Sequence, residues 1–214
     1  MAALRRSSQV SRKRSVEFFE QQFRRQVQAK EFVLNPFETL AVDYLSGDVL
    51  DLGCGLGNLS LEAARRGCRV TAIDASPAGI SRIRKAAEEE SLPVEASVTN
   101  LGTYAMAREY DTIVAIGLLM FFRRDRALAL LNEIQAHVKP GGRAIVNVLV
   151  EGTTFLEMFE PPNYYLFKHE DLLNCFAAWK VLAWRPESYP APRETIKVFT
   201  TLIAEKTAPL SRRG

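Results

Sequence analysis

Three glycines at alternate positions are the residues of this sequence that point most clearly to chemistry. Gly53, Gly55 and Gly57 follow the mostly apolar run Val49–Leu52, and an apolar helical pattern begins at Leu59. Glycine permits positive φ and lets a ligand lie against bare backbone, and the first turn of a helix offers unpaired N–H groups. A strand, a tight turn and a helix start in this order predict a nucleotide-binding loop.

The glycine spacing separates this loop from two common nucleotide-binding motifs. A dinucleotide fingerprint has the form G-x-G-x-x-G, and its third glycine would fall on Asn58. A P-loop has the form G-x-x-x-x-G-K-[ST], and no lysine follows the glycines here, so a triphosphate has no partner. The ligand predicted by this loop is therefore of another kind.

An acidic residue follows at the end of the next predicted strand. Asp74 ends the run 69–74 and lies 23 positions after Asp51 (74 − 51), close to the ~20-residue spacing of the ribose-binding acid in βαβ folds. A carboxylate accepts two hydroxyl hydrogen bonds, which suits a ribose diol. The alternative is that the glycines form an ordinary tight turn and that Asp74 only caps a helix.

The pattern Asp51-x-Gly53-x-Gly55-x-Gly57, together with Asp74, resembles motif I and the following acid of the class I S-adenosylmethionine-dependent methyltransferases. The resemblance implies that the loop packs against the methionine and ribose parts of S-adenosyl-L-methionine, with S-adenosyl-L-homocysteine as product and no metal. Asn100 stands where this family usually has an acid, and its amide oxygen can still accept a hydrogen bond from adenine. The cofactor-binding residues implied are Asp51, Gly53, Cys54, Gly55, Gly57, Asn58, Asp74, Ala75, Asn100, Leu101 and Ile116.

The hydrophobic periodicity predicts an α/β protein. Helical patterns cover 15–31, the stretch after an Asn35-Pro36 cap, 59–64, 77–90, 126–138 and 169–177. Strand patterns cover 49–52, 69–74, 93–98, 110–116, 143–150, 179–185 and 195–203. The resemblance implies a Rossmann-like three-layer sandwich whose seven-stranded, mostly parallel sheet has the order 3-2-1-4-5-7-6, with the last strand antiparallel.

Length and composition bound the class of protein. A chain of 214 residues with 47% hydrophobic and 25% charged residues is typical of one globular α/β domain. The net charge of +3 is too small to argue for nucleic acid, and no apolar run approaches the ~20 residues of a membrane span. Three scattered cysteines favour a reducing, cytoplasmic location, and two histidines disfavour a His-based metal site.

The chain divides by composition into tails and one domain. Residues 1–14 are rich in Arg and Ser and contain no acid, which predicts a disordered basic tail; a transit peptide and an arm that touches RNA or membrane are the alternatives. Residues 208–214 form a second predicted tail. The domain 15–207 is expected to comprise a helical cover (15–45), a cofactor-binding core (46–150), and a lid loop with two C-terminal strands (151–207).

The methyl acceptor is expected where the fourth strand ends. The exit Leu119-Met120-Phe121 is apolar and favours a small or soft nucleophile, and the long aromatic connection 151–168 predicts a substrate lid. This exit and the run 163–172 resemble the tellurite-resistance methyltransferases, which act on small chalcogen oxyanions and related soft nucleophiles. Where those enzymes have a His-Arg pair before the last strand, this chain has Pro192-Arg193-Glu194.

Site residues for the acceptor come from these segments and from the stretch before the last strand. The predicted substrate-binding residues are Met120, Phe121, Tyr164, Tyr165 and Arg193, and the predicted catalytic residues are His169 and Tyr165. The alternatives are core packing for Met120 and Phe121, a solvated surface charge for Arg193 and a helix-start role for His169. Further candidate anion holders are Arg123, Arg124 and Lys168.

Three functions remain open at this point. The first is a small-molecule methyltransferase, acting as a monomer or homodimer with no membrane or nucleic-acid partner. The second is a methyltransferase that reaches RNA or protein through the basic tail. The third is a non-catalytic cofactor-binding protein.

Overall fold

A computed structural model describes the backbone of residues 2–159 and 161–208, and the side chains from Ser15 onwards. Its sheet has the order β3-β2-β1-β4-β5-β7-β6, as expected. The five strands β1 to β5 pair in parallel, whereas β7 runs antiparallel to both β5 and β6. The strands are β1 Asp48–Leu52, β2 Arg69–Asp74, β3 Val94–Val98, β4 Tyr110–Ile116, β5 Val138–Leu149, β6 Lys180–Ala191 and β7 Thr195–Glu205.

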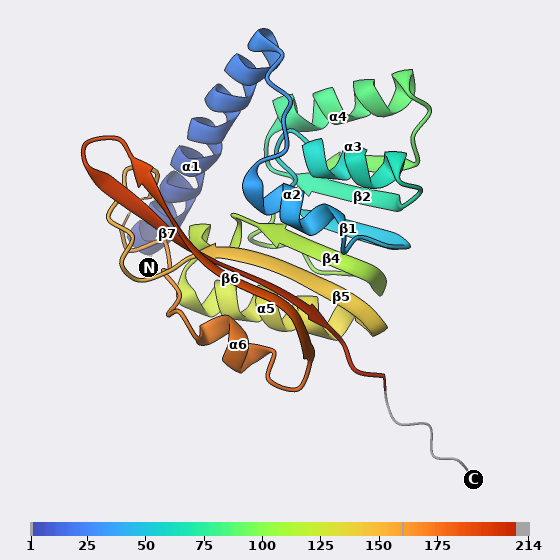
Figure 1. The fold of residues 1–214 in the computed structure, drawn as a ribbon. Coiled ribbons are helices and arrows are strands. Elements are labelled where there is room, and N and C mark those ends of the chain that lie inside the picture. Colours follow the sequence, from blue (N-terminus) through green and yellow to red (C-terminus); the bar gives the residue numbers. More distant parts are fainter. Residues whose placement is uncertain (1, 160, 209–214) are drawn as a thin grey trace.

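Helices cover both faces of this sheet and complete the three-layer sandwich (Figure 1). One apolar core joins α2, α3 and α4 to the sheet, and a second joins α5 and α6 to the other face. β1 is buried along its whole length, as a central parallel strand covered on both faces should be. The helices are α1 Ala2–Ala29, α2 Pro36–Val42, α3 Asn58–Arg65, α4 Pro77–Glu89, the 3₁₀ turn η1 Leu119–Phe121, α5 Arg124–His137 and α6 Asp171–Cys175.

Local sequence signals account for the helix starts near the glycine loop. Asn35 caps α2 in a capping box, accepting from the N–H of Glu38 while Glu38 accepts from the N–H of Asn35. Ser76 caps α4, with Pro77 in the first turn. These caps fix where the helices begin at the carboxyl edge of the sheet.

The N-terminal segment differs from the expectation of a disordered tail. The backbone of residues 2–14 continues α1, which runs from Ala2 to Ala29. Most residue types in this segment are good helix formers. Because residues 15–29 already form a helix, each residue added to it gains one backbone hydrogen bond without a new nucleation cost. The predicted C-terminal tail, 208–214, lies almost wholly outside the described residues, which end at 208.

The last two strands are longer than the sequence pattern predicted. Pairing between β5 and β7 ends at Leu149 and Phe199, whereas β6 and β7 stay paired as far as Ala191 and Thr195. The hairpin therefore projects past the edge of the sheet towards α1 (Figure 1). The segment 151–168 begins along it, because the N–H groups of Thr154 and Phe155 both donate to the carbonyl of Ile196.

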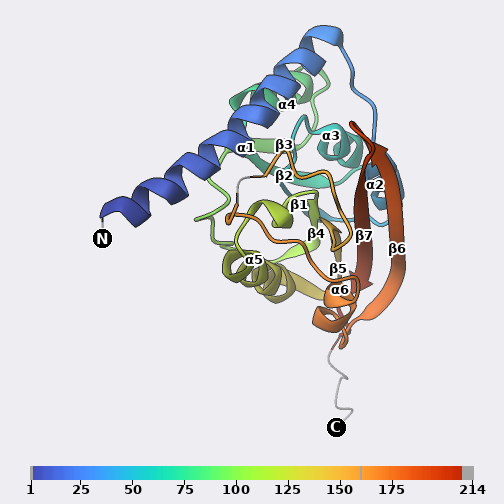
Figure 2. The same cartoon turned by 90° about the vertical axis from the view of Figure 1, so that its left-hand side faces the viewer.

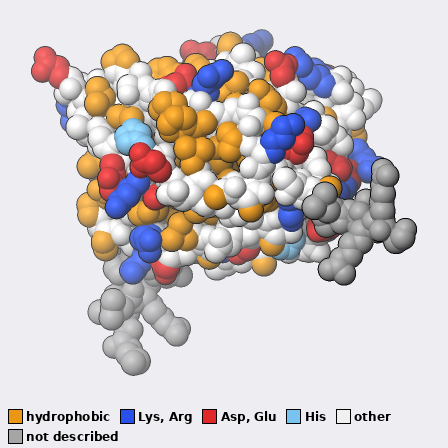
Figure 3. Space-filling view, turned by 60° about the horizontal axis from the view of Figure 1, so that its bottom comes forward, with side chains coloured by type: hydrophobic (Ala, Val, Ile, Leu, Met, Phe, Trp, Pro, Cys, Tyr) orange, Lys and Arg blue, Asp and Glu red, His pale blue; other side chains and the backbone are white. Residues whose placement is uncertain are grey.

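The protein surface is mixed in character. Figure 3 brings forward the face at the bottom of Figure 1 and shows hydrophobic side chains near its middle with charged side chains around them. Val181 and Trp184 on β6 are among the large hydrophobic residues that are exposed, at 42% and 38%. No helix in the part of the chain described is long and apolar enough to cross a membrane.

Candidate functional site

A cavity of about 760 Å³ opens at the carboxyl edge of the sheet, where open α/β sheets bind ligands. Figure 2 looks onto this edge, with α1 running diagonally past it and the 151–168 segment crossing the middle. One end of the cavity is formed by the glycine loop and the ends of β2 and β3. The other end is formed by the exits of β4 and β5, the 151–168 segment and β7.

The glycine loop adopts the conformation that its spacing predicts. Gly53, Gly55 and Gly57 have φ of +71°, +54° and +72°, the left-handed region that disfavours other residues. Gly53 and Gly55 line the cavity, whereas Gly57 does not. A Cβ on Gly57 would lie 2.3 Å from Cγ1 of Ile83, so this glycine is needed for packing against α4.

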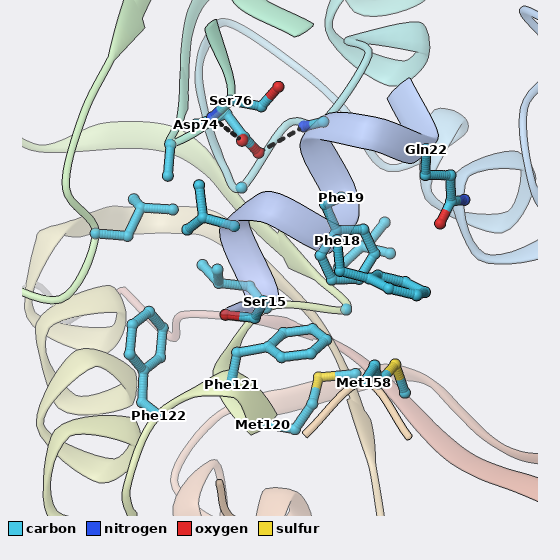
Figure 4. Close-up of a pocket in the computed structure, with 18 of the residues that line it drawn as sticks. Ser15, Phe18, Phe19, Gln22, Asp74, Ser76, Met120, Phe121, Phe122 and Met158 are labelled. Atoms are coloured by element: carbon cyan, nitrogen blue, oxygen red, sulfur yellow. Dashed lines mark hydrogen bonds between the residues drawn. The ribbon is translucent and has the colours of Figure 1, made fainter. Parts of the chain in front are cut away.

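Asp74 ties the glycine loop to the end of β2. Its Oδ2 accepts from the N–H of Gly55 at 2.9 Å and its Oδ1 accepts from the N–H of Ser76 at 2.8 Å (Figure 4). Burial raises the pKa of this carboxyl, and the backbone hydrogen bonds act in the opposite direction. Each carboxylate oxygen has a second lone pair, so Asp74 can accept further hydrogen bonds from a ligand in the cavity.

Four of the predicted cofactor-binding residues do not line the cavity: Asp51, Cys54, Gly57 and Asn58. Asp51 is buried and accepts from the hydroxyl of Ser60 at 2.6 Å, and burial raises its pKa to about 7. The amide of Asn58 donates to the carbonyl of Val33 at 3.0 Å, and Cys54 is buried in the core beside α3. The contacts of Asp51 and Asn58 tie the loop to α3 and to the segment before α2.

The remaining predicted cofactor-binding residues do line the cavity. They are Gly53, Gly55, Asp74, Ala75, Asn100, Leu101 and Ile116. Asn100 uses its amide oxygen within its own turn, accepting from the N–H of Gly102 at 3.2 Å. A second lone pair on that oxygen is available to a ligand, so adenine recognition by Asn100 stays a prediction.

Helix α1 covers the cavity and contacts residues at both the polar end and the apolar end of the cavity. At the polar end, Glu20 accepts from the hydroxyl of Ser76 and from the N–H of Ala78. Burial acts to raise the pKa of Glu20, but the hydrogen bonds and its ion pair with Arg24 lower it overall. At the apolar end, the ring of Phe19 meets that of Phe121 edge to face at 5.2 Å (Figure 4).

The apolar end contains two of the predicted substrate-binding residues, Met120 and Phe121. Aromatic and methionine side chains from other elements complete its wall: Phe37, Phe155, Met158 and Phe199. Two polar residues that the sequence interpretation did not single out also line it. They are Asn147, at the end of β5, and Lys197, on β7.

The other predicted acceptor residues are not among those that line the cavity. Tyr164 stacks on Phe159 with ring centroids 4.7 Å apart, behind the wall. The hydroxyl of Tyr165 donates to Asp171 at 2.9 Å, and burial together with this contact raises the pKa of the phenol. Arg193 lies at the turn between β6 and β7 and pairs with Glu157.

His169 also lies away from the cavity, in the turn before α6. Two backbone hydrogen bonds fix the path of the chain here: the N–H of Tyr165 donates to the carbonyl of Met120, and the N–H of Phe167 to that of Leu149. This path carries residues 165–169 along the end of the sheet towards α6. In the residues that the structure covers, no group of three or more His, Cys, Asp and Glu could hold a metal ion.

Comparison with known proteins identifies the family that this chain resembles. Residues 49–142 match the family model described as a methyltransferase domain. "Hemagglutinin 1" of Eikenella corrodens is 30% identical over 163 residues, which make up 73% of this chain and 54% of that protein. "Probable S-adenosyl-L-methionine-dependent methyltransferase TehB" of Haemophilus influenzae (strain 10810) is 28% identical over 137 residues, 64% of this chain and 47% of that protein. The chain therefore spans about half the length of these curated relatives.

Solved structures show the same fold. TehB from Haemophilus influenzae superposes with a TM-score of 0.70 at 22% identity, covering 81% of this chain and 63% of that one. The 1,6-didemethyltoxoflavin-N1-methyltransferase of Burkholderia thailandensis, solved with 1,6-didemethyltoxoflavin and S-adenosylhomocysteine, gives 0.64 at 22% identity and covers 96% and 88%. The resemblance to the class I S-adenosylmethionine-dependent methyltransferases and their tellurite-resistance branch is confirmed.

Proposed function

We propose that this protein is an S-adenosylmethionine-dependent methyltransferase that acts on a small-molecule acceptor. One observation carries the proposal: a single cavity joins a glycine loop held by Asp74 to an apolar chamber at the exit of β4. A nucleotide-type ligand fits the first end and a small organic molecule the second. The matching methyltransferase-domain model and the name of the TehB relative support the same reading.

The residues at the polar end fit this cofactor. Gly55 lies against the ring of Phe23, where an added Cβ would come within 3.1 Å of Cζ. The bare backbone of Gly55 therefore lets the ring of Phe23, on α1, pack directly on the loop. Asp74 retains lone pairs for a ribose diol, and Ala75, Leu101 and Ile116 offer apolar contacts to a base and thioether. When bound, S-adenosylmethionine supplies an electrophilic methyl group on a positively charged sulfur.

The chain's own part in the reaction is to align the two ligands and exclude water. Phe19 and Phe121 close over the chamber, and α1 is held against it through Glu20. No histidine belongs to the described lining, so an acceptor nucleophile that needs no histidine base suits this cavity. That requirement favours a thiol or another soft chalcogen nucleophile, which is ionised or strongly nucleophilic near neutral pH.

The first test is calorimetric titration of S-adenosylmethionine into the wild type and into Asp74→Ala. Loss of the ribose contact is expected to weaken binding about tenfold or more. A turnover screen for S-adenosylhomocysteine release would follow, with tellurite, selenite, thiols, small carboxylates and tRNA. Absence of binding by the folded wild type would overturn the cofactor assignment, and turnover on tRNA alone would favour a macromolecular acceptor.

Location and assembly remain predictions from composition. A cytoplasmic location is consistent with the free cysteines at 54, 68 and 175, whereas the monomeric or homodimeric state stays a prediction. Size-exclusion chromatography with light scattering would measure the oligomeric state directly.

A further inference from the structure

We propose that the methyl acceptor is an apolar or aromatic organic molecule that carries a carboxylate, and that Lys197 binds this carboxylate. The inference deepens the proposed function and rests on it for the nature of the reaction. It concerns the apolar end of the cavity, where the structure places a cation that the sequence interpretation missed.

The charges that line the cavity are few and far apart. Among the described lining side chains only Asp74 and Lys197 are ionisable. Asp74 ends β2 and Lys197 lies on β7, four strands away in the sheet order. At about 4.8 Å per strand the two strands lie roughly 19 Å apart in the sheet. Asp74 therefore does not neutralise Lys197, and the two charges mark opposite ends of the cavity.

Lys197 is held without an anionic partner. Its ammonium lies 4.6 Å from the ring centroid of Phe155, a cation–π contact, and it is half-buried. Within the described part of the chain the ammonium group makes no hydrogen bond or ion pair, and burial lowers the pKa of Lys197. Partial burial of an unpaired charge is unfavourable. A carboxylate bound beside it would restore the missing partner.

The residues between the two charges suit an apolar molecule. Phe37, Met158 and Phe199 supply apolar surface. Asn147 is fully buried and donates from Nδ2 to the hydroxyl of Thr201 at 2.8 Å, while its Oδ1 has no partner among the described residues. Asn147 is paired in register with Ile116, so it lies between the two ends of the cavity. Both the residue and its amide oxygen are out of reach of solvent, so Asn147 contributes to the packing of the wall and offers no accessible hydrogen-bonding atom to the acceptor.

The balance of charge favours a carboxylate over other anions. One ammonium in an apolar chamber matches one negative charge, whereas a doubly charged phosphate would leave a charge unpaired in that chamber. A small inorganic oxyanion would fill little of the aromatic space around Phe155 and Phe199. An apolar molecule with one carboxylate would pair with the ammonium of Lys197 and also pack against the apolar side chains of the wall.

Binding to the protein saturated with S-adenosylhomocysteine tests the inference without turnover. The probes are benzoate, 4-mercaptobenzoate and 1-naphthoate, each paired with its uncharged primary amide, and calorimetry measures the dissociation constants. The variants are Lys197→Met and Lys197→Arg. Lys180→Met is the matched control, because Lys180 pairs in register with Glu205 at the other end of the hairpin and does not line the cavity.

The wild type and Lys180→Met are expected to bind at least one carboxylate about tenfold or more tightly than its amide, the effect of one charge-assisted contact. Lys197→Met should lose that preference and Lys197→Arg should keep most of it. Affinity for S-adenosylhomocysteine should stay within about twofold in every variant.

Three outcomes would overturn the inference: no carboxylate preference in the wild type, a preference that survives in Lys197→Met, or a loss of S-adenosylhomocysteine affinity in Lys197→Met. The last would assign the ammonium to the cofactor's own carboxylate. If the wild type does not bind S-adenosylhomocysteine at all, the proposed function fails. The carboxylate preference, measured on the ligand-free chain, then still decides the role of Lys197.

Discussion

Replacing Gly57 with alanine tests whether this loop glycine is required for packing against α4 rather than for contact with a ligand. Gly57 has φ +72°, and its added Cβ would lie 2.3 Å from Cγ1 and 2.5 Å from Cδ1 of Ile83. The left-handed backbone costs a non-glycine residue about 1–2 kcal/mol, and overpacking a core adds about 1–3 kcal/mol. Gly57→Ala should therefore lower the free energy of unfolding by about 2–5 kcal/mol.

Gly67 provides the matched control for this substitution. It has φ +90°, and its added Cβ would meet nothing within 4 Å. Gly67→Ala should therefore show the backbone cost alone, about 1–2 kcal/mol. Urea unfolding followed by circular dichroism measures both losses. Equal losses at the two positions would refute the argument that Gly57 is required by its contact with Ile83.

A double substitution locates the clash. Ile83 is fully buried, and Ile83→Ala alone is expected to cost about 2–5 kcal/mol. In that background Gly57→Ala should cost only the backbone strain, because the atoms that the new methyl group meets are gone. A coupling energy near zero between the two substitutions would contradict the predicted contact.

Two further predictions concern side chains at and near the site. The pKa of Asp51 is raised from 3.8 to about 7 in the folded chain, so folding binds a proton between these values and stability rises as pH falls from 8 to 5. Asp51→Asn should remove about 2–3 kcal/mol of the rise in the free energy of unfolding between pH 8 and 5, because Asn does not titrate. Urea unfolding at several pH values measures this rise, and the same pH dependence in the wild type and the variant would contradict the prediction. His169 lies outside the described lining, so His169→Ala should keep turnover within about twofold of the wild type; a hundredfold loss would restore its predicted catalytic role.

Much of the polar end of the site was predictable because its determinants are local in sequence. Positive φ at Gly53 and Gly55 follows from residue type, and Asp74 was placed correctly because a strand pattern ends at it. The order of the sheet came from the family resemblance, since periodicity alone does not fix which strands are neighbours. Within the loop, sequence did not separate Gly55, which lines the cavity, from Gly57, which packs against α4.

The acceptor end was poorly predicted because it depends on register between distant segments. Arg193 and Lys197 are four residues apart, yet the hairpin turn directs Arg193 to Glu157 while the strand brings Lys197 to the cavity. Tyr165 was expected to face the substrate, but the bridge between Val150 and Phe167 fixes the chain so that its hydroxyl meets Asp171. A lone charge within the apolar pattern of β7 was the signal that could have identified Lys197.

The anchoring of α1 has a kinetic consequence for the proposed enzyme. The same helix contacts the polar end through Glu20 and Ser76 and the apolar end through Phe19 and Phe121. A rigid-body movement of α1 that breaks both contacts would displace the cover over both ends together. Cofactor exchange and acceptor exchange would then share one opening step. The rate of that step would set an upper limit on turnover for any acceptor, whatever its intrinsic reactivity.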